Sequence, residues 1–147
     1  MASVYRYRRG PLVLRWIGKS GTVAIEMGDM LKHNGLTANK VTPVSASGDA
    51  SALVGVAMMA SPTTDTSGTK VKYAAIGYGT VFEMAIAASD DHGLGERFVI
   101  SGAQELTKVT TWTNCCAVCA ETKGSSSTNT LVSFLPGILQ RTISATG

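Results

Sequence analysis

The chain has 147 residues, of which 44% are hydrophobic and 16% charged, below the roughly 25% charged residues of an average domain. This composition excludes a disordered chain, and the length allows one domain with a core that needs no disulfides. Five of the 13 basic residues lie in residues 1–20, which contain no acidic residue and have a net charge of +5. The rest of the chain has eight basic and ten acidic residues, which gives a net charge of −2. The low charge content of the body suggests assembly with other molecules, and the basic N-terminus suggests an acidic partner or a phosphate backbone.

The N-terminal segment alternates Tyr5 and Tyr7 with Arg6 and Arg8, which is a strand-like pattern, and Gly10-Pro11 ends it. We expect residues 1–11 to form an extended arm that becomes ordered on a partner, leaving residues 12–147 as one β-barrel domain. The alternatives are an edge strand of the protein's own barrel or a frayed terminus. The N-terminus has no apolar signal core and no run approaches 18 apolar residues, so we expect no membrane span.

The remaining chain is predicted to be all-β, because no window keeps a helical period over three turns. Residues 12–17 and 22–27 are expected to form a hairpin, and residues 45–51 a polar loop. A helix of about one turn is plausible only at residues 85–89. The other expected strands are short and separated by Gly-, Pro- and Ser-rich turns: 30–32, 40–42, 53–59, 70–75, 80–84, 97–100, 106–112, 115–120, 131–135 and 138–143.

Two of these strands are apolar on both faces, which is typical of strands buried on both sides. The first, residues 52–60, has Gly55 at its centre, and this indicates a bend or a close backbone neighbour. The second, residues 114–121, contains all three cysteines of the chain. We expect the rest of the fold to be arranged around this pair.

The order of elements after Gly28 repeats after Gly95. Each half has a glycine, an acid (Asp29 or Glu96), a short strand, a Thr-rich strand, a small-apolar strand and a final strand that runs into glycine. Gly95 then corresponds to Gly28, and Ala117 to Gly55, with loops of different length between them. This predicts two related halves, 28–84 and 95–139, that together close a small barrel or sandwich. Chance echoes among small residues in an all-β chain are the alternative.

No residue pattern points to catalysis, a cofactor or a metal. Cys115, Cys116 and Cys119 lack a second ligand pair for zinc, and we interpret them as small buried hydrophobic residues made in a reducing compartment. The cluster 90–92 lies in a Gly-rich turn, where Asp is common. Residues 18–21 resemble part of a phosphate-binding loop but lack its first glycine and its helix. We therefore expect no enzymatic activity.

The pattern resembles that of capsid decoration (cement or stabilising) proteins of tailed-phage heads, the lambda-type family with a compact β-barrel or "β-tulip" fold. The resemblance covers roughly residues 20–140, and the second half departs from it by having Cys115-Cys116-x-x-Cys119 where the first has Val-Gly-Val-Ala. The matching residues of the first half are Gly28-Asp29, Asn34-Gly35, Leu53-Val54-Gly55-Val56-Ala57 and Gly79-Thr80-Val81-Phe82-Glu83, and the second half echoes them with Gly95-Glu96, Cys116-Ala117-Val118 and residues 131–137.

The resemblance implies a structural virion protein, made in the bacterial host cytoplasm, that binds the outer surface of the expanded head. It would cement neighbouring major capsid subunits, as a homotrimer or a dimer, without a cofactor. The implied capsid-binding residues belong to the arm: Val4, Tyr5, Arg6, Tyr7, Arg8 and Arg9.

Two other functions stay open. A β-barrel module that binds carbohydrate or a receptor would favour aromatic residues on loops, whereas Trp16 and Trp112 both fall in expected strands. A single-stranded nucleic-acid binder could use the Arg/Tyr pattern of the arm. Nucleic acid is the less favoured partner, because the body is slightly acidic and its strands show no aromatic platform.

Overall fold

A computed structural model describes residues 7–34, 39–77, 79–86, 93–102, 104–121 and 129–135. These residues contain no α-helix, and no helix among them is long and apolar enough to cross a membrane. The described elements are one 3₁₀ helix, η1 (Ser47–Ala52), and the strands β1 (Tyr7–Arg9), β2 (Leu14–Lys19), β3 (Met30–His33), β4 (Lys40–Pro43), β5 (Leu53–Ala57), β6 (Lys70–Ala75), β7 (Val81–Ala85), β8 (Arg97–Ile100), β9 (Leu106–Val109), β10 (Ala117–Glu121) and β11 (Asn129–Phe134).

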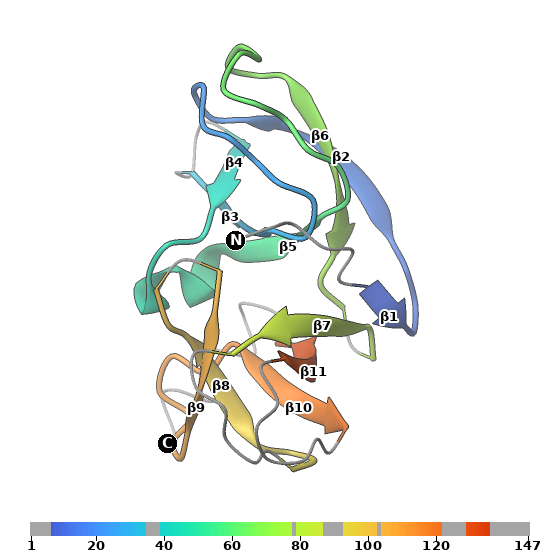
Figure 1. Ribbon diagram of the computed structural model, residues 1–147, viewed down its shortest axis with the longest axis vertical. Coiled ribbons are helices and arrows are strands. Elements are labelled where there is room, and N and C mark those ends of the chain that lie inside the picture. The colour runs from blue at the N-terminus through green and yellow to red at the C-terminus, as the bar shows by residue number, and fades with distance from the viewer. Residues whose placement is uncertain are drawn as a thin grey trace.

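The first half of the chain forms a closed barrel with the strand order β2-β4-β3-β5-β6, drawn at the top of Figure 1. Neighbouring strands are antiparallel except β2 and β4, which close the barrel in parallel through Gly18 and Lys19. Closure matters because a strand paired on both sides offers no free ladder to other chains. Among the described residues, the closing contact involves the last part of β2 alone.

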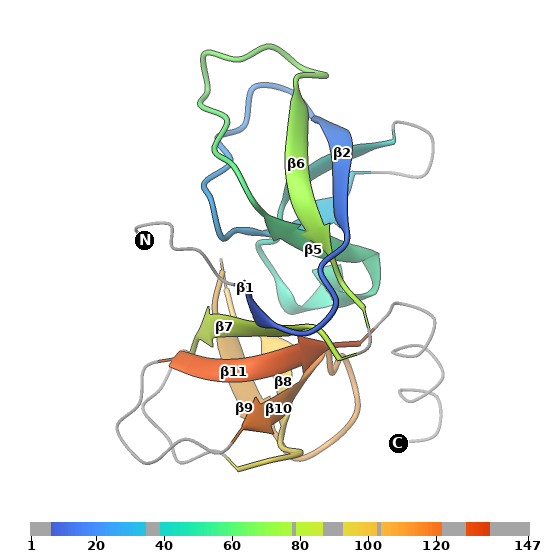
Figure 2. The same cartoon turned by 90° about the vertical axis from the view of Figure 1, so that its right-hand side faces the viewer.

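The second half forms a six-stranded sheet with the order β1-β7-β11-β10-β8-β9, in the lower part of Figures 1 and 2. All of its ladders are antiparallel. A single parallel bridge between Ile86 and Leu106 joins the end of β7 to the start of β9. Within the described residues, the sheet therefore closes at this one bridge and not through a full ladder.

The two halves have the same topology, which bears out the expected all-β fold of two related halves. Reading β4-β3-β5-β6-β2 against β9-β8-β10-β11-β7 gives the same order, the same antiparallel ladders and a parallel contact between the two ends. Leu31 pairs with Gly55, and Phe98 pairs with Ala117, the residue that the sequence aligns with Gly55. The predicted bounds 28–84 and 95–139 were wrong, because the repeat begins with β2 and β7, so β7, predicted at the end of the first half, is the first strand of the second. The two halves also do not close one barrel together, since the first closes by itself.

The turn before the third strand of the barrel, β3, and its counterpart before β8 show the repeat at the level of single hydrogen bonds. Gly28 and Gly95 have φ values of +94° and +86°, a region that glycine adopts without strain. The Gly28 N–H donates to the Ala57 carbonyl at 2.8 Å, and the Gly95 N–H donates to the Cys119 carbonyl at 3.0 Å. In return, the N–H groups of Ala57 and Cys119 donate to the carbonyls of the residues that follow these glycines.

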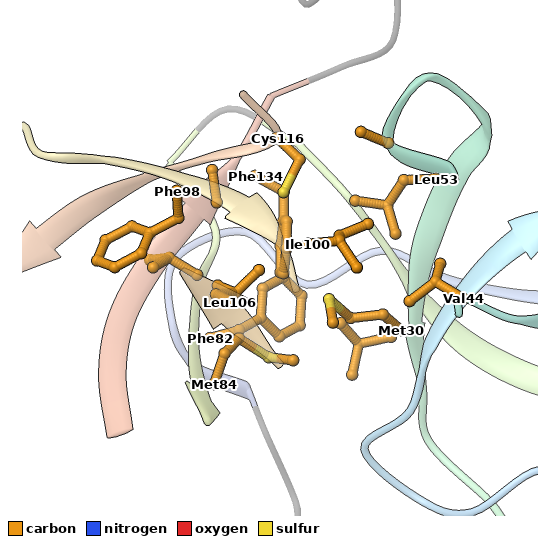
Figure 3. Packing of buried hydrophobic residues seen from close by; sticks show 14 of the residues in the cluster. Met30, Val44, Leu53, Phe82, Met84, Phe98, Ile100, Leu106, Cys116 and Phe134 are labelled. Atoms are coloured by element: carbon orange, nitrogen blue, oxygen red, sulfur yellow. The ribbon is translucent and has the colours of Figure 1, made fainter. Parts of the chain in front are cut away.

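One hydrophobic core joins the two halves (Figure 3). Met30, Val44 and Leu53 of the first half pack with Phe82 and Phe134 of the second, and all five side chains are buried. A separate cluster, which includes Ile17, fills the interior of the first barrel. The halves therefore share a hydrophobic core.

Gln104 ties the halves together through hydrogen bonds as well. Its side chain accepts from the Met30 N–H at 2.5 Å and donates to the carbonyls of Met30 and Val44, both at 3.1 Å. The Gln104 amide thus makes the hydrogen bonds that a neighbouring strand would otherwise make with the backbone of Met30. Met30 is the first residue of β3 and is buried. Gln104 itself has a φ of +65°, which is uncommon outside glycine.

Gly55 lies where the sequence predicts a close backbone neighbour. A Cβ added at Gly55 would come within 2.2 Å of the Ala74 carbonyl oxygen and 2.7 Å of the Tyr73 ring. The prediction that β5 is buried on both faces is also confirmed, since Leu53, Gly55, Val56 and Ala57 are buried and Val54 is half-buried.

Three local predictions were wrong. Residues 22–27 form no strand, because only Ile25 bridges, to Ser61, and β2 pairs with β6 and β4 instead of a hairpin partner. Within the predicted polar loop 45–51, the 3₁₀ helix η1 begins at Ser47, where the Asp49 carboxylate accepts from the N–H groups of Ser45 and Ala46. The short helix predicted at 85–89 begins in strand β7, and its residues 87–89 lie outside the described part of the chain, as does the strand predicted at 138–143.

Candidate interaction surface

Strand β1 lies on the outer side of β7 and is anchored there by Tyr7. The Tyr7 ring packs edge-on against Phe82 with 6.3 Å between ring centroids, and its hydroxyl donates to the Gly10 carbonyl at 2.6 Å. The backbone pairing is antiparallel, with Tyr7 opposite Phe82 and Arg9 opposite Val81. Residues 7–9 therefore belong to the folded sheet.

The two arginines of β1 are paired with carboxylates of the same chain. Arg8 Nε lies 3.4 Å from Glu83 of β7, and Arg9 Nη1 lies 2.8 Å from Glu121 of β10. Both pairs are partly exposed to solvent, so each contributes little to stability. In both pairs, a basic residue of β1 contacts an acidic residue of the sheet.

Of the six predicted capsid-binding residues, Tyr7, Arg8 and Arg9 are described and form this strand, whereas Val4, Tyr5 and Arg6 lie outside the described residues. The expected boundary at residue 11 does not separate Tyr7–Arg9 from the folded domain. These three residues form an edge strand in the protein's own sheet, one of the alternatives left open by the sequence. Capsid binding by the six residues stays a prediction.

A second surface was missed by sequence reasoning and lies directly after β1. Residues 11–16 are all exposed, and four of them are large and apolar: Leu12, Val13, Leu14 and Trp16, with 39%, 48%, 45% and 60% of their surface accessible. An exposed apolar run of this kind is unusual on a strand that begins a closed barrel. We call residues 12–16 the β2 edge.

The backbone of the β2 edge is open on one side. The Val13 carbonyl accepts from Ala75 N–H, and Lys19 bonds with the backbone of residues 68 and 69, so odd-numbered residues face the β6 side. Because backbone groups alternate in direction along a strand, those of Leu14 and Trp16 face the opposite side. Among the described residues, β4 pairs with β2 on that side only at Gly18 and Lys19.

Positive charge surrounds the β2 edge. Lys72 of β6 lies opposite Trp16, with its Nζ 5.8 Å from the centre of the indole ring. The exposed Arg15 lies between Leu14 and Trp16 and extends toward the other face of the strand. The edge thus combines apolar side chains with cations on both of its faces.

The three cysteines are buried in the described structure. All three thiols are buried and free, and the described residues contain no cluster of His, Cys, Asp and Glu that could hold a metal. Burial raises the pKa of both Cys115 and Cys116, which leaves these thiols protonated and unreactive. The predicted packing role agrees with this burial, and Asp90, Asp91 and His92 lie outside the described residues.

Comparison with solved structures finds a similar fold in the crystal structure of the head fiber gp8.5 N base in bacteriophage phi29. The TM-score is 0.50 at 11% sequence identity, and the match covers 84% of this chain and 98% of the other. No protein-family model matches the chain, and no curated protein matches it in sequence. At this identity the likeness shows a shared fold.

Proposed function

We propose that this protein is a structural component of a phage head. It binds the outer surface of the expanded capsid and cements neighbouring major capsid subunits, without enzymatic activity or a cofactor. The observation that carries the proposal is the fold shared with a head fiber base over 84% of this chain and 98% of that one.

The described surface supports a binding role. Candidate catalytic or metal-binding side chains do not cluster among the described surface residues. Two extended segments, β1 and the β2 edge, follow one another in the sequence and carry cations. Electrostatic pairing with acidic capsid subunits would guide docking. Several copies joined as a dimer or homotrimer would bind through many weak contacts at once, which gives avidity without one strong site.

The predicted arm keeps a part in this proposal. Val4, Tyr5 and Arg6 precede β1 directly, so a segment that becomes ordered on the capsid would start from a fixed strand. Arg8 and Arg9 would have to exchange their pairing with Glu83 and Glu121 for capsid carboxylates, which is easy for exposed pairs.

Co-sedimentation with expanded heads assembled without this protein tests the proposal. The full chain should bind saturably, and a chain without residues 1–6 should bind more weakly while unfolding at the same temperature. This truncation leaves β1 and its contacts with β7 in place. A full chain that stays in the supernatant at all concentrations would contradict the proposed function.

The double substitution of Arg8 and Arg9 to alanine tests the part of the contact that belongs to β1. This variant should also bind heads more weakly than the full chain, because these two arginines would no longer pair with capsid carboxylates. Equal binding by the full chain, the truncation and this variant would keep the head-protein proposal but contradict the six predicted capsid-binding residues.

A further inference from the structure

The internal repeat makes the open side of β2 comparable with an edge that is already occupied. Arg15 pairs with Tyr73, and Phe82 pairs with Val132, at equivalent places in the two halves. Leu14, Arg15 and Trp16 therefore correspond to Val81, Phe82 and Glu83. On β7, this edge is covered by the antiparallel strand β1. On β2, no described residue pairs with it.

The two edges differ in charge, and β1 shows why that matters. The β7 edge carries Glu83, with Glu121 close by, and the strand lying on it is basic. The β2 edge carries Arg15, with Lys72 against Trp16, and no described acid pairs with Arg15 or Lys72. A strand that fits this edge needs apolar side chains for Leu14 and Trp16 and carboxylates for the two cations.

We infer that the β2 edge binds an extended acidic and apolar segment of a partner protein, as an antiparallel strand added to the first barrel. This inference rests on the proposed function, in which the partner is the major capsid protein. Backbone hydrogen bonds to Leu14 and Trp16 provide the pairing, and the side chains provide the selectivity. The partner residue opposite Arg15 occupies the place that Tyr7 has opposite Phe82.

A second copy of this chain fits the edge less well. Pairing β2 with β2 across a two-fold axis brings Arg15 and Lys72 of both copies together, and like charges on paired strands repel. Pairing β2 with β1 of another copy brings Arg8 and Arg9 toward the same cations. The charge of the edge therefore favours a different, acidic chain.

Three variants of the full chain test the inference in the head-binding assay. Leu14→Pro removes the N–H that faces the open side, and proline is tolerated on strand edges. Arg15→Glu reverses the charge, and Trp16→Ala removes the largest apolar contact. Each should weaken binding to expanded heads by about tenfold or more, whereas Arg15→Lys should restore most of it.

Lys108→Glu is the matched control, because Lys108 is an exposed base on β9 in the second half, paired with Glu96 at 3.2 Å. It makes the same charge change away from β2 and should bind like the wild type. Thermal unfolding of every variant identifies any loss that reflects misfolding, and Arg15→Glu keeps the test valid if Leu14→Pro does not fold.

The outcomes separate this inference from the proposed function. If the wild type and all folded β2-edge variants bind heads equally well, the inference is wrong but the proposed function is not contradicted. No binding by the wild type would overturn both. Analytical ultracentrifugation adds one more outcome: if Leu14→Pro or Arg15→Glu dissociates an oligomer, the occupant is a second copy and the inference is wrong.

Discussion

The two halves share one topology but complete it in different ways. The first closes its barrel through Gly18 and Lys19, has an interior cluster of its own and, among the described residues, leaves the start of β2 open on one side. The second, in the described part of the chain, closes at the Ile86–Leu106 bridge and covers the equivalent edge with β1. The same strand order can therefore produce a covered edge or an open one, depending on a few side chains and on the strand next to them.

The largest difference between equivalent residues should be between Phe82 and Arg15. Phe82 is fully buried between Tyr7 and Phe134, so Phe82→Ala should lower the free energy of unfolding by about 3–5 kcal/mol. Arg15→Ala at the exposed edge should change it by less than about 0.5 kcal/mol. Urea denaturation measures both, and similar losses would contradict the assignment of the two residues to equivalent positions in different environments.

The central strands of the two halves should differ by a smaller amount. Gly55→Ala introduces a Cβ against the Ala74 carbonyl and should destabilise the fold by about 1–3 kcal/mol through overpacking. Its equivalent Ala117 already accommodates a Cβ in the core, and Ala117→Gly should cost about 1 kcal/mol through lost burial and added chain entropy. Urea denaturation compares the two, and a Gly55→Ala protein as stable as the wild type would show that β5 and β6 can separate without cost.

Gln104→Ala tests whether the halves unfold together. It leaves the buried Met30 N–H without its acceptor and should cost about 1–3 kcal/mol. Gln104→Glu keeps that acceptor but places a carboxylate oxygen against the carbonyls of Met30 and Val44, so at neutral pH it should cost at least as much. Calorimetry of Gln104→Ala should still show one unfolding transition, because the shared core remains. Two separated transitions would mean that the hydrogen bonds of Gln104 hold the halves together.

The smallest expected effect concerns Asp49 of η1, which has no described counterpart in the second half. Burial acts to raise its pKa, but hydrogen bonds from Lys32 and from the Ser45 and Ala46 backbone outweigh this, and the folded-state pKa is lowered. The carboxylate therefore stabilises the fold above its ordinary pKa, near 4, and this contribution is lost as pH falls through the folded value. Asp49→Asn should cost about 1 kcal/mol at pH 7 and progressively less toward pH 2, measured by urea denaturation. A cost that does not change with pH would rule out the charged form as its source.

Strand positions and the internal repeat can be predicted from the sequence because both depend on local features. The turn glycines need positive φ, and central strands buried on both faces need small apolar residues without interruption, so Gly28, Gly95 and Gly55 mark their places directly. The burial of Cys115–Cys119 follows from the same pattern. The wrong hairpin at 22–27 has the right alternation, but only Ile25 forms a bridge there, and β6 pairs with β2 instead.

The candidate surfaces are less accessible to sequence reasoning. Tyr7–Arg9 has the same sequence whether it becomes an arm or a strand, and the presence of Phe82, Glu83 and Glu121 beside it makes it a strand. The sequence predicts Trp16 inside a strand pair, yet it lies on the outer face at an open edge. Alternation assigns a residue to one of two faces but does not say which face another element covers.

An all-β chain, two related halves in which Gly95 matches Gly28, and a basic N-terminus on a nearly neutral body can all be read from local sequence features, because turns and buried strands are specified by residues close in the chain. The closure of the first half, the core that joins the halves and the pairing of β1 with β7 become visible only in three dimensions. The same holds for the start of β2, which no described residue covers on one side. Closure, covering and exposure depend on partners that are distant in the chain, such as Tyr7 on Phe82 and Gln104 on Met30.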